Sequence, residues 1–252
     1  MTTDISYIGM ALGLLLMLLP IYFFYRFKTG QILSTLLATT RMVVQLFLIG
    51  LYLKYLFLWN NPFINILWVI IMVVVAAFTG ARRAHLRLRT MLLPLIGGFF
   101  ASALLVGMYL LVFVLQLRHP FDARYFVPIM GILMGNMLSV CVIGLTTFYD
   151  GLHREQGLYY YLLGNGSSRM EAVTPFLRKA IDKSFAPCIA NMAVMGIVSL
   201  PGTMIGQILG GSAPGIAIKY QMMIIVITFT ASLLALMLTI YLSERKRKLN
   251  EL

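Results

Sequence analysis

Charged residues are scarce in this sequence. Of its 252 residues only 11% are Asp, Glu, Lys or Arg, whereas 60% are hydrophobic. A soluble domain is about a quarter charged, so this shortage excludes an ordinary cytosolic enzyme and a disordered or repeat protein. The sequence predicts an all-α, polytopic helical membrane protein, folded as a single transmembrane domain over residues 1–252.

Cysteine is also rare. Cys141 and Cys188 are the two cysteines, and both lie in apolar stretches. Their spacing fits neither a disulfide framework nor a zinc site. We expect both to be buried, small apolar residues.

Acidic residues are missing from every long apolar stretch. Proton-driven transporters commonly place Asp, Glu or His within the bilayer as proton relays, so we expect no coupling to a proton gradient here. The sequence also lacks a P-loop, an HExxH motif and a nucleophile elbow, and we predict no catalytic residues. The eight acids, all outside the apolar stretches, are Asp4, Asp122, Asp150, Glu155, Glu171, Asp182, Glu244 and Glu251.

Apolar stretches long enough to cross a bilayer are what the sequence does contain. A crossing helix needs about 20 predominantly apolar residues, and about seven stretches approach that length. We expect the first to be a retained anchor and not a signal peptide, because it has no basic segment before it and Arg26 and Lys28 follow it. The stretches cover residues 5–25, 40–57, 63–80, 91–115, 125–148, 185–200 and 217–242.

The cationic residues are unevenly distributed between these stretches. Of the 20 Lys and Arg residues, 16 fall in alternate connections on one side and 4 on the other. Cationic residues favour the cytoplasmic side, which places the N-terminus outside and the C-terminus in the cytoplasm of a multi-pass cell-membrane protein. The net charge of +12 therefore reflects orientation, and we expect no nucleic-acid partner.

Two polar residues stand out in the second apolar stretch. Arg41 and Gln45 are four residues apart and lie on one face of a helix. Arg41 either extends to the cytoplasmic interface or pairs with another helix within the bundle, and both interpretations stay open.

The fifth and sixth apolar stretches combine methionine with asparagine. In the fifth, Met130, Met134 and Met137 form one helical stripe beside Asn136. A thioether is a soft metal ligand, but methionine also fills gaps in helix packing. Substrate path and packing are both possible roles, and Gly131 and Gly135 favour close helix approach. The candidate path residues are Met130, Met134, Asn136, Met137, Asn191, Met192, Met195 and Gln207.

A glycine-rich segment follows the sixth stretch. Pro201 and Gly202 are expected to end the helix and form a break or gate. Beyond them, Gln207 lies in an apolar surrounding, and several glycines make the backbone permissive. Residues 202–215 are either a re-entrant gate or an external loop with a short amphipathic helix.

The longest connection, residues 149–183, lies on the predicted cytoplasmic side. The pattern predicts two short helices around a break at Gly164, with a capping box from Ser168 to Glu171. Pro175 is expected to kink the second helix. Such a helix could dock in a groove of a soluble partner, or lie at the membrane interface without a partner.

Three segments carry a resemblance to a known family. VPIMGILMGNMLS, YYYLLGNGSSRMEAVTPFLRKAI and MGIVSLPGTMIGQILGG…APGIAIKYQM resemble the FetB-type iron-export permeases, with plant aluminium-sensitivity permeases as relatives. The resemblance covers nearly the whole chain, including Arg41, Gln45 and the segment GARRAH. It implies the permease half of an ATP-binding-cassette transporter, acting as a homodimer with two separate ATPase chains.

The resemblance also implies where energy enters. Mg-ATP would be bound by the partner ATPase, with no cofactor on this chain. The connection after Gly164 is about two residues longer than the family's usual turn. The residues expected to contact the ATPase are Tyr160, Tyr161, Leu163, Gly164 and Glu171.

The substrate implied by the resemblance is iron or another metal cation moved outward. A plant relative has been linked to a nucleotide sugar, so an organic solute is the alternative, and a stand-alone gradient-driven transporter is a further one. The sequence has no His, Asp and Glu cluster that would hold Fe²⁺ firmly, and its metal ligands stay unassigned.

Overall fold

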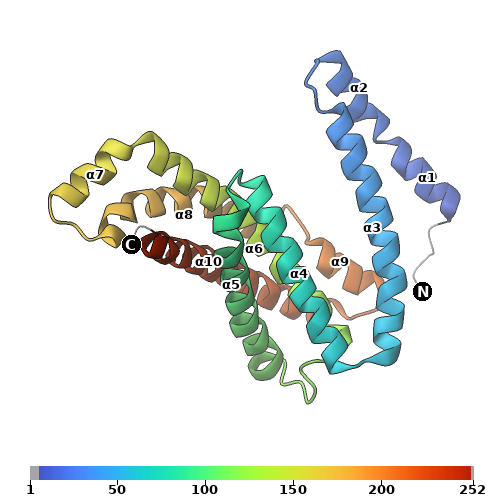
Figure 1. The fold of residues 1–252 in the computed structure, drawn as a ribbon. Coiled ribbons are helices and arrows are strands. Elements are labelled where there is room, and N and C mark those ends of the chain that lie inside the picture. Colours follow the sequence, from blue (N-terminus) through green and yellow to red (C-terminus); the bar gives the residue numbers. More distant parts are fainter. Residues whose placement is uncertain (1–5, 251–252) are drawn as a thin grey trace. The chain divides into compact units, whose positions relative to one another are not determined.

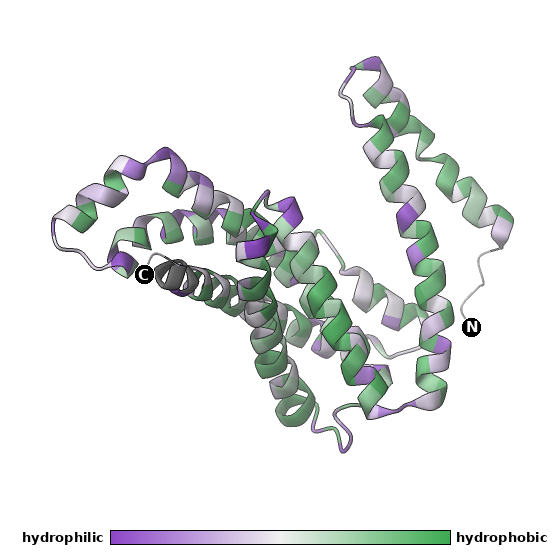
Figure 2. Cartoon of the chain, in the orientation of Figure 1, coloured by the Kyte–Doolittle hydropathy of each residue, from purple (hydrophilic) through white to green (hydrophobic). Residues whose placement is uncertain are grey.

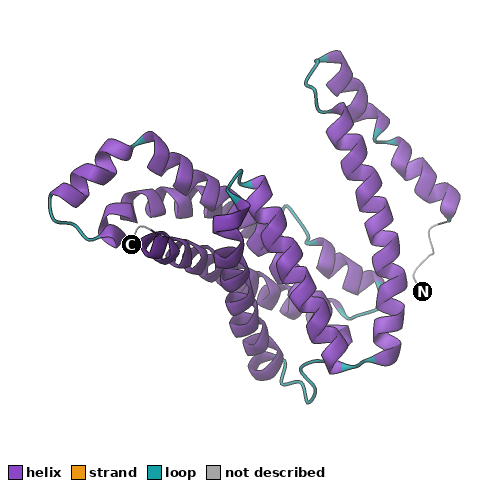
Figure 3. Cartoon of the chain, in the orientation of Figure 1, coloured by secondary structure: helices purple, strands orange, loops and turns teal. Residues whose placement is uncertain are grey.

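The structure is a computed structural model, and it describes residues 6–250. Helices account for almost all of this range, as Figure 3 shows, and the described residues contain no β-strand. The start of the predicted first stretch at Ile5, and the acids Asp4 and Glu251, lie outside the described residues. The helices are α1 (Tyr7–Leu15), α2 (Leu18–Arg26), α3 (Ile32–Trp59), α4 (Pro62–Arg83), α5 (Leu88–Met108), the π-helical turn η1 (Tyr109–Val114), α6 (Ala123–Arg154), α7 (Gln156–Gly164), α8 (Arg169–Val194), α9 (Gly202–Leu209) and α10 (Pro214–Asn250).

The chain divides into two compact units. One holds residues 1–59 and 209–211, and the other holds residues 60–208 and 212–252. In the first, α1 and α2 follow each other as one apolar stretch, Tyr7–Arg26, and α3 packs against α2. Ser6 caps α1 by accepting the N–H of Gly9.

The second unit is a helical bundle with α10 packed against α5 and α6 (Figure 1). Glycine allows α10 to approach its neighbours closely. A Cβ on Gly144 of α6 would lie 2.7 Å from Cδ1 of Leu236, and one on Gly98 of α5 would lie 3.0 Å from the backbone oxygen of Ala235. Figure 2 shows that apolar residues dominate α4 and α5, whereas hydrophilic residues gather where α6 meets α7.

Two pairs of contacts fix the relative direction of α6 and α10. Gly144 lies beside Leu236, and the hydroxyl of Tyr149 lies 2.7 Å from that of Ser243. Residue numbers rise together along both helices, so α6 and α10 are parallel. The chain between Arg154 and Pro214 must therefore return from one end of the bundle to the other.

Most of this return is made by α8, which runs antiparallel to α6. Gly151, near the end of α6, lies against Phe176, whereas Asn136, earlier in α6, lines a cavity together with Asn191, later in α8. We expected a short loop helix followed by a separate sixth span. Instead, α8 is one helix from Arg169 through Pro175 and Pro187 to Val194.

Six helical segments of the described chain are long and apolar enough to cross a membrane, and they match six of the seven predicted stretches. The exception is the stretch at 185–200. Only its first part, up to Val194, is helical, and it belongs to the more polar α8. The parallel arrangement of α6 and α10 still requires the chain to pass along the bundle here.

Candidate functional site

A cavity with a mixed polar and apolar lining lies between α6, α8 and α10. Its volume is about 250 Å³. No Asp, Glu, Lys, Arg or His lines it, so it offers only neutral groups. The polar and sulfur-containing residues that line it are Asn136, Cys188, Asn191, Met192, Met195, Thr203, Gln221, Thr228 and Ser232; Ile132, Ile224, Ile225 and Phe229 complete the lining.

Several donors around the cavity are already engaged by the protein. The amide nitrogen of Asn136 donates to the carbonyl of Ile132 at 2.9 Å. The hydroxyl of Thr228 donates to Ile225, and that of Ser232 donates to Thr228. Each of these side chains has an oxygen atom that can interact with a cation in the cavity, and no Lys or Arg lines the cavity to bind an anion, so it is a better environment for a cation than for an anion.

A hydrogen bond joins α9 to α10 at the edge of this cavity. The hydroxyl of Thr203 donates to the amide oxygen of Gln221. Gln221 is only 8% exposed, and its carbonyl therefore has the partner that a buried polar group requires. The start of α9 is thus attached to the cavity wall.

The helical path is broken beside the cavity. Met195 follows α8 with an extended backbone, and Gly196 has a φ of 89°. The N–H of Gly196 donates to the carbonyl of Ser199 at 2.8 Å, which closes a tight turn. Discontinuous helices that frame a polar site are typical of membrane transporters.

The position of this break corrects one prediction. Pro201 and Gly202 were expected to end the preceding helix, but α8 ends at Val194. Gly202 instead begins α9, and the N–H of Ile205 donates to the carbonyl of Pro201. The positive φ of Gly196 is the feature that turns the chain.

The structure brings together four of the predicted path residues. Asn136, Asn191, Met192 and Met195 all line the cavity. Gln207 lies further along α9 and does not line it. The stripe of Met130, Met134 and Met137 is almost fully buried in helix packing, with the thioether of Met130 beside Gly107 of α5.

The contribution of α10 to the cavity was not predicted from the sequence. Gln221, Thr228 and Ser232 occur at i, i+7 and i+11 and so lie on one helical face. A polar face within the last apolar stretch was the signal that would have found them. Cys188 was treated as a packing residue, although it also lines the cavity.

Arg41 and Gln45 belong to the first unit. Both side chains are exposed on the middle part of α3. Neither interpretation of Arg41 is tested by this arrangement, so its role stays a prediction.

The predicted contact region for a partner lies at the other end of α6 and α8. There α7 connects the two helices, and Tyr160 and Tyr161 are 63% and 67% exposed. Leu163 is half-buried and Gly164 is exposed beside it. The capping box is confirmed: the N–H of Ser168 donates to Oε2 of Glu171 at 2.7 Å, and the N–H of Glu171 donates to Oγ of Ser168 at 3.3 Å.

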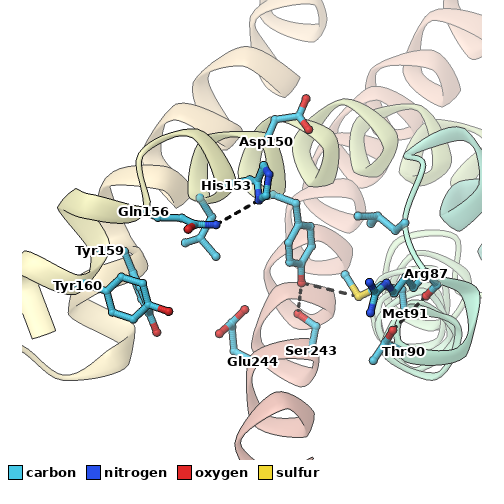
Figure 4. A pocket seen from close by; sticks show the side chains of 13 residues that line it. Arg87, Thr90, Met91, Asp150, His153, Gln156, Tyr159, Tyr160, Ser243 and Glu244 are labelled. Atoms are coloured by element: carbon cyan, nitrogen blue, oxygen red, sulfur yellow. Dashed lines mark hydrogen bonds between the residues drawn. The ribbon is translucent and has the colours of Figure 1, made fainter.

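A larger pocket of about 620 Å³ opens beside α7 (Figure 4). It lies between the starts of α5 and α7 and the ends of α6 and α10. His153 and Gln156 are joined at 3.2 Å, and Glu244 lies across from Tyr160. Asp150 points away from Glu244 in this view. Within residues 6–250, no group of three or more His, Cys, Asp and Glu side chains is placed to hold a metal ion.

Apolar helices long enough to span a bilayer define a multi-pass membrane protein. A cavity beside a helix break, as at the end of α8, is a feature typical of membrane transporters. Comparison with known families agrees with this class. The chain belongs to the family described as "Uncharacterised protein family (UPF0014)", whose model matches residues 7–247.

Relatives from bacteria and plants match most of the chain. UPF0014 membrane protein YjkA of Bacillus subtilis is 29% identical over 91% of this chain and 90% of its own length. The probable iron export permease protein FetB of Escherichia coli is 27% identical over 94% of this chain and 90% of its own. Protein ALUMINUM SENSITIVE 3 of Arabidopsis thaliana is 29% identical over 85% of this chain and 77% of its own. No solved structure matches the chain.

These relatives confirm the expected family. The relative named as a permease is consistent with a transporter rather than an enzyme, and the apolar helices agree with a multi-pass protein of the cell membrane.

Proposed function

We propose that this chain is the membrane-spanning permease subunit of an ATP-binding-cassette exporter, which moves iron or another metal cation out of the cytoplasm. The observation that carries the proposal is the uncharged cavity, which is lined with oxygen and sulfur acceptors and lies beside the helix break that follows α8. The name of the Escherichia coli relative, a probable iron export permease, supports a metal cation as substrate.

The cavity argues against a nucleotide sugar as the substrate. The negative charge of a pyrophosphate group is usually balanced by Arg or Lys, and no Arg or Lys lines this cavity. Its volume of about 250 Å³ is also below the roughly 300–1,000 Å³ typical of pockets for organic ligands.

Energy would enter through α7. The sequence has no P-loop, so the proposal places Mg-ATP on a separate ATPase, with two copies acting on a homodimer of this chain. Exposed Tyr160 and Tyr161 form the contact surface on α7. Movement of α7 would shift α6 and α8 together, because Lys179 and Glu155 join these helices next to it. The bundle would then alternate between two packings that open the cavity to opposite sides.

The test is ATP-dependent accumulation of iron and of other metal cations in inside-out vesicles that carry this chain and a candidate ATPase chain of the cassette type. We expect accumulation only when both chains and Mg-ATP are present. Accumulation without the ATPase would contradict the proposal and favour a stand-alone transporter. Accumulation of a nucleotide sugar and of no metal would contradict the cation assignment.

A matched pair of variants tests the role of α7. Tyr161→Ala should leave the ATPase active but reduce transport, because it removes an exposed side chain of the contact surface. Tyr109→Ala is the control, since Tyr109 is also exposed, at 56%, but lies in η1. Equal transport by the two variants would count against α7 as the contact.

A further inference from the structure

Sulfur atoms are concentrated at one side of the cavity. Cys188 and Met192 lie near the end of α8, and Met195 directly follows that helix; all three line the cavity. Cys188 and Met192 are one helical turn apart and so share one helix face, and the extended backbone at Met195 brings a third sulfur-containing residue to the same cavity. One thiol and two thioethers therefore belong to the lining of one small volume.

The oxygen atoms opposite are amides and hydroxyls. Asn136 lies across from α8 on α6; one N–H of its amide donates to Ile132, and its amide oxygen can act as a ligand. Gln221 already accepts from Thr203. The lining contains no carboxylate or imidazole, and these are the ligands that harder divalent ions prefer.

We propose that this cavity is a coordination site for a soft, singly charged metal ion of the Cu(I) type, held by Cys188, Met192 and Met195. The inference rests on the proposed function and specifies the class of cation. Thiolate and thioether are the ligands that select such an ion.

The charge balance of the site supports a single positive charge. A cysteine thiol loses its proton when it binds a metal. One thiolate and one Cu(I) make a neutral complex, whereas the same thiolate with Fe(II) leaves one positive charge uncompensated. An uncompensated charge within the bilayer is costly. Each Cu(I) bound should therefore release one proton at a pH where Cys188 is a thiol.

The test measures metal affinity of the full chain in lipid nanodiscs under anaerobic conditions. Cu(I) is titrated against a colorimetric Cu(I) chelator, and Fe(II) against a colorimetric Fe(II) chelator. We expect Cu(I) to bind more tightly than Fe(II), with one ion per chain. Tighter binding of Fe(II) would overturn the proposal.

Matched variants assign the ligands. We expect Cys188→Ala and the double variant Met192→Leu/Met195→Leu each to weaken Cu(I) binding by at least about tenfold, since loss of even an outer-shell partner typically has that effect. The controls are Cys141→Ala, whose thiol is buried in α6 away from the cavity, and Met222→Leu/Met223→Leu, whose side chains do not line it. Equal affinities of Cys188→Ala and Cys141→Ala would overturn the assignment.

X-ray absorption by Cu(I) bound to the unmodified chain gives a second measurement that needs no variant. We expect sulfur in the coordination shell, and a shell of nitrogen and oxygen alone would overturn the proposal.

Vesicle transport separates this inference from the proposed function. If the chain accumulates iron in an ATP-driven manner but binds no Cu(I), the Cu(I) site is contradicted and the transport function is supported. If Cu(I) binds in a manner that depends on Cys188 but no metal is moved by ATP, the transport function is contradicted and the Cu(I) site is supported.

Discussion

The hydroxyl groups of Tyr149 and Ser243 lie 2.7 Å apart and join α6 to α10. The same hydroxyl of Tyr149 lies 3.7 Å from the sulfur of Met91 on α5. One side chain thus connects three helices of the bundle at the end nearest α7.

Removing this hydroxyl should weaken the bundle. We expect Tyr149→Phe to lower the free energy of unfolding by about 1 kcal/mol, the typical net value of a hydrogen bond. The measurement is the denaturation midpoint in detergent. Tyr160→Phe is the control, because Tyr160 is 63% exposed. Equal midpoints for the two variants would show that the contact contributes nothing.

The close approach of α6 and α10 gives a second prediction. Gly144→Ala places a methyl group 2.7 Å from Cδ1 of Leu236, so we expect destabilisation of about 1–3 kcal/mol from overpacking. Gly135→Ala is the control, since nothing lies within 4 Å of a Cβ there. Leu236→Ala combined with Gly144→Ala should be less destabilised than the two separate effects predict. Strict additivity would show that the two residues do not interact.

The two groups of predicted path residues should differ in transport. We expect the triple variant Met130→Leu, Met134→Leu and Met137→Leu to retain ATP-dependent transport, because leucine preserves their buried packing. Asn136→Leu should reduce transport, because it removes an amide oxygen from the cavity. Initial rates in vesicles with equal amounts of protein make the comparison. Loss of transport in the triple variant alone would place the path along the methionine stripe.

The capping box at the start of α8 should respond to acid. The backbone N–H of Ser168 donates to the carboxylate of Glu171 and, with the Ser168 side chain, lowers the pKa of Glu171. A lowered pKa stabilises the helix start above the carboxyl's ordinary pKa of about 4.3, and this contribution is lost as the pH falls through the lower folded-state value. We therefore expect amide protection in the first turn of α8 to be constant between about pH 7 and 5 and to fall below about pH 4.

Two substitutions check this assignment. Glu171→Gln should remove the acid dependence while keeping an oxygen acceptor, and Ser168→Ala should weaken the first turn at neutral pH, with a smaller effect below about pH 4. Hydrogen exchange, corrected for intrinsic rates, is the measurement. An unchanged acid response in Glu171→Gln would assign it to another group.

Much of the bundle could be predicted because hydrophobicity along the chain determines it. Long apolar runs predicted α3, α4, α5 and α10, and the local pattern around Ser168 and Glu171 predicted the start of α8. These features depend on neighbouring residues. The end of α8 could not be predicted so well, since Pro201 and Gly202 were the stronger local signals and the chain turns instead at Gly196.

The cavity was harder to predict, because it forms between packed helices and the residue pattern of one apolar stretch does not encode contacts between helices. The pattern of asparagine and methionine in the fifth and sixth apolar stretches was sufficient to identify Asn136, Asn191, Met192 and Met195. Gln221 and Cys188 were missed because their positions become significant only when α6, α8 and α10 are packed together. The same packing separates the stripe of Met130, Met134 and Met137 from the cavity.

The short apolar end of α8, which connects α6 to α10 along the bundle, has a consequence for biosynthesis. From Phe185 to Val194, α8 provides only about 15 Å of apolar helix, half of what the translocon requires to release a segment into lipid. We expect this segment to settle in the bilayer only after α10 has been synthesised and can pack beside it. Ribosome-bound chains that stop before residue 214 should therefore leave a glycosylation tag after Val194 unmodified, and chains that include α10 should modify it.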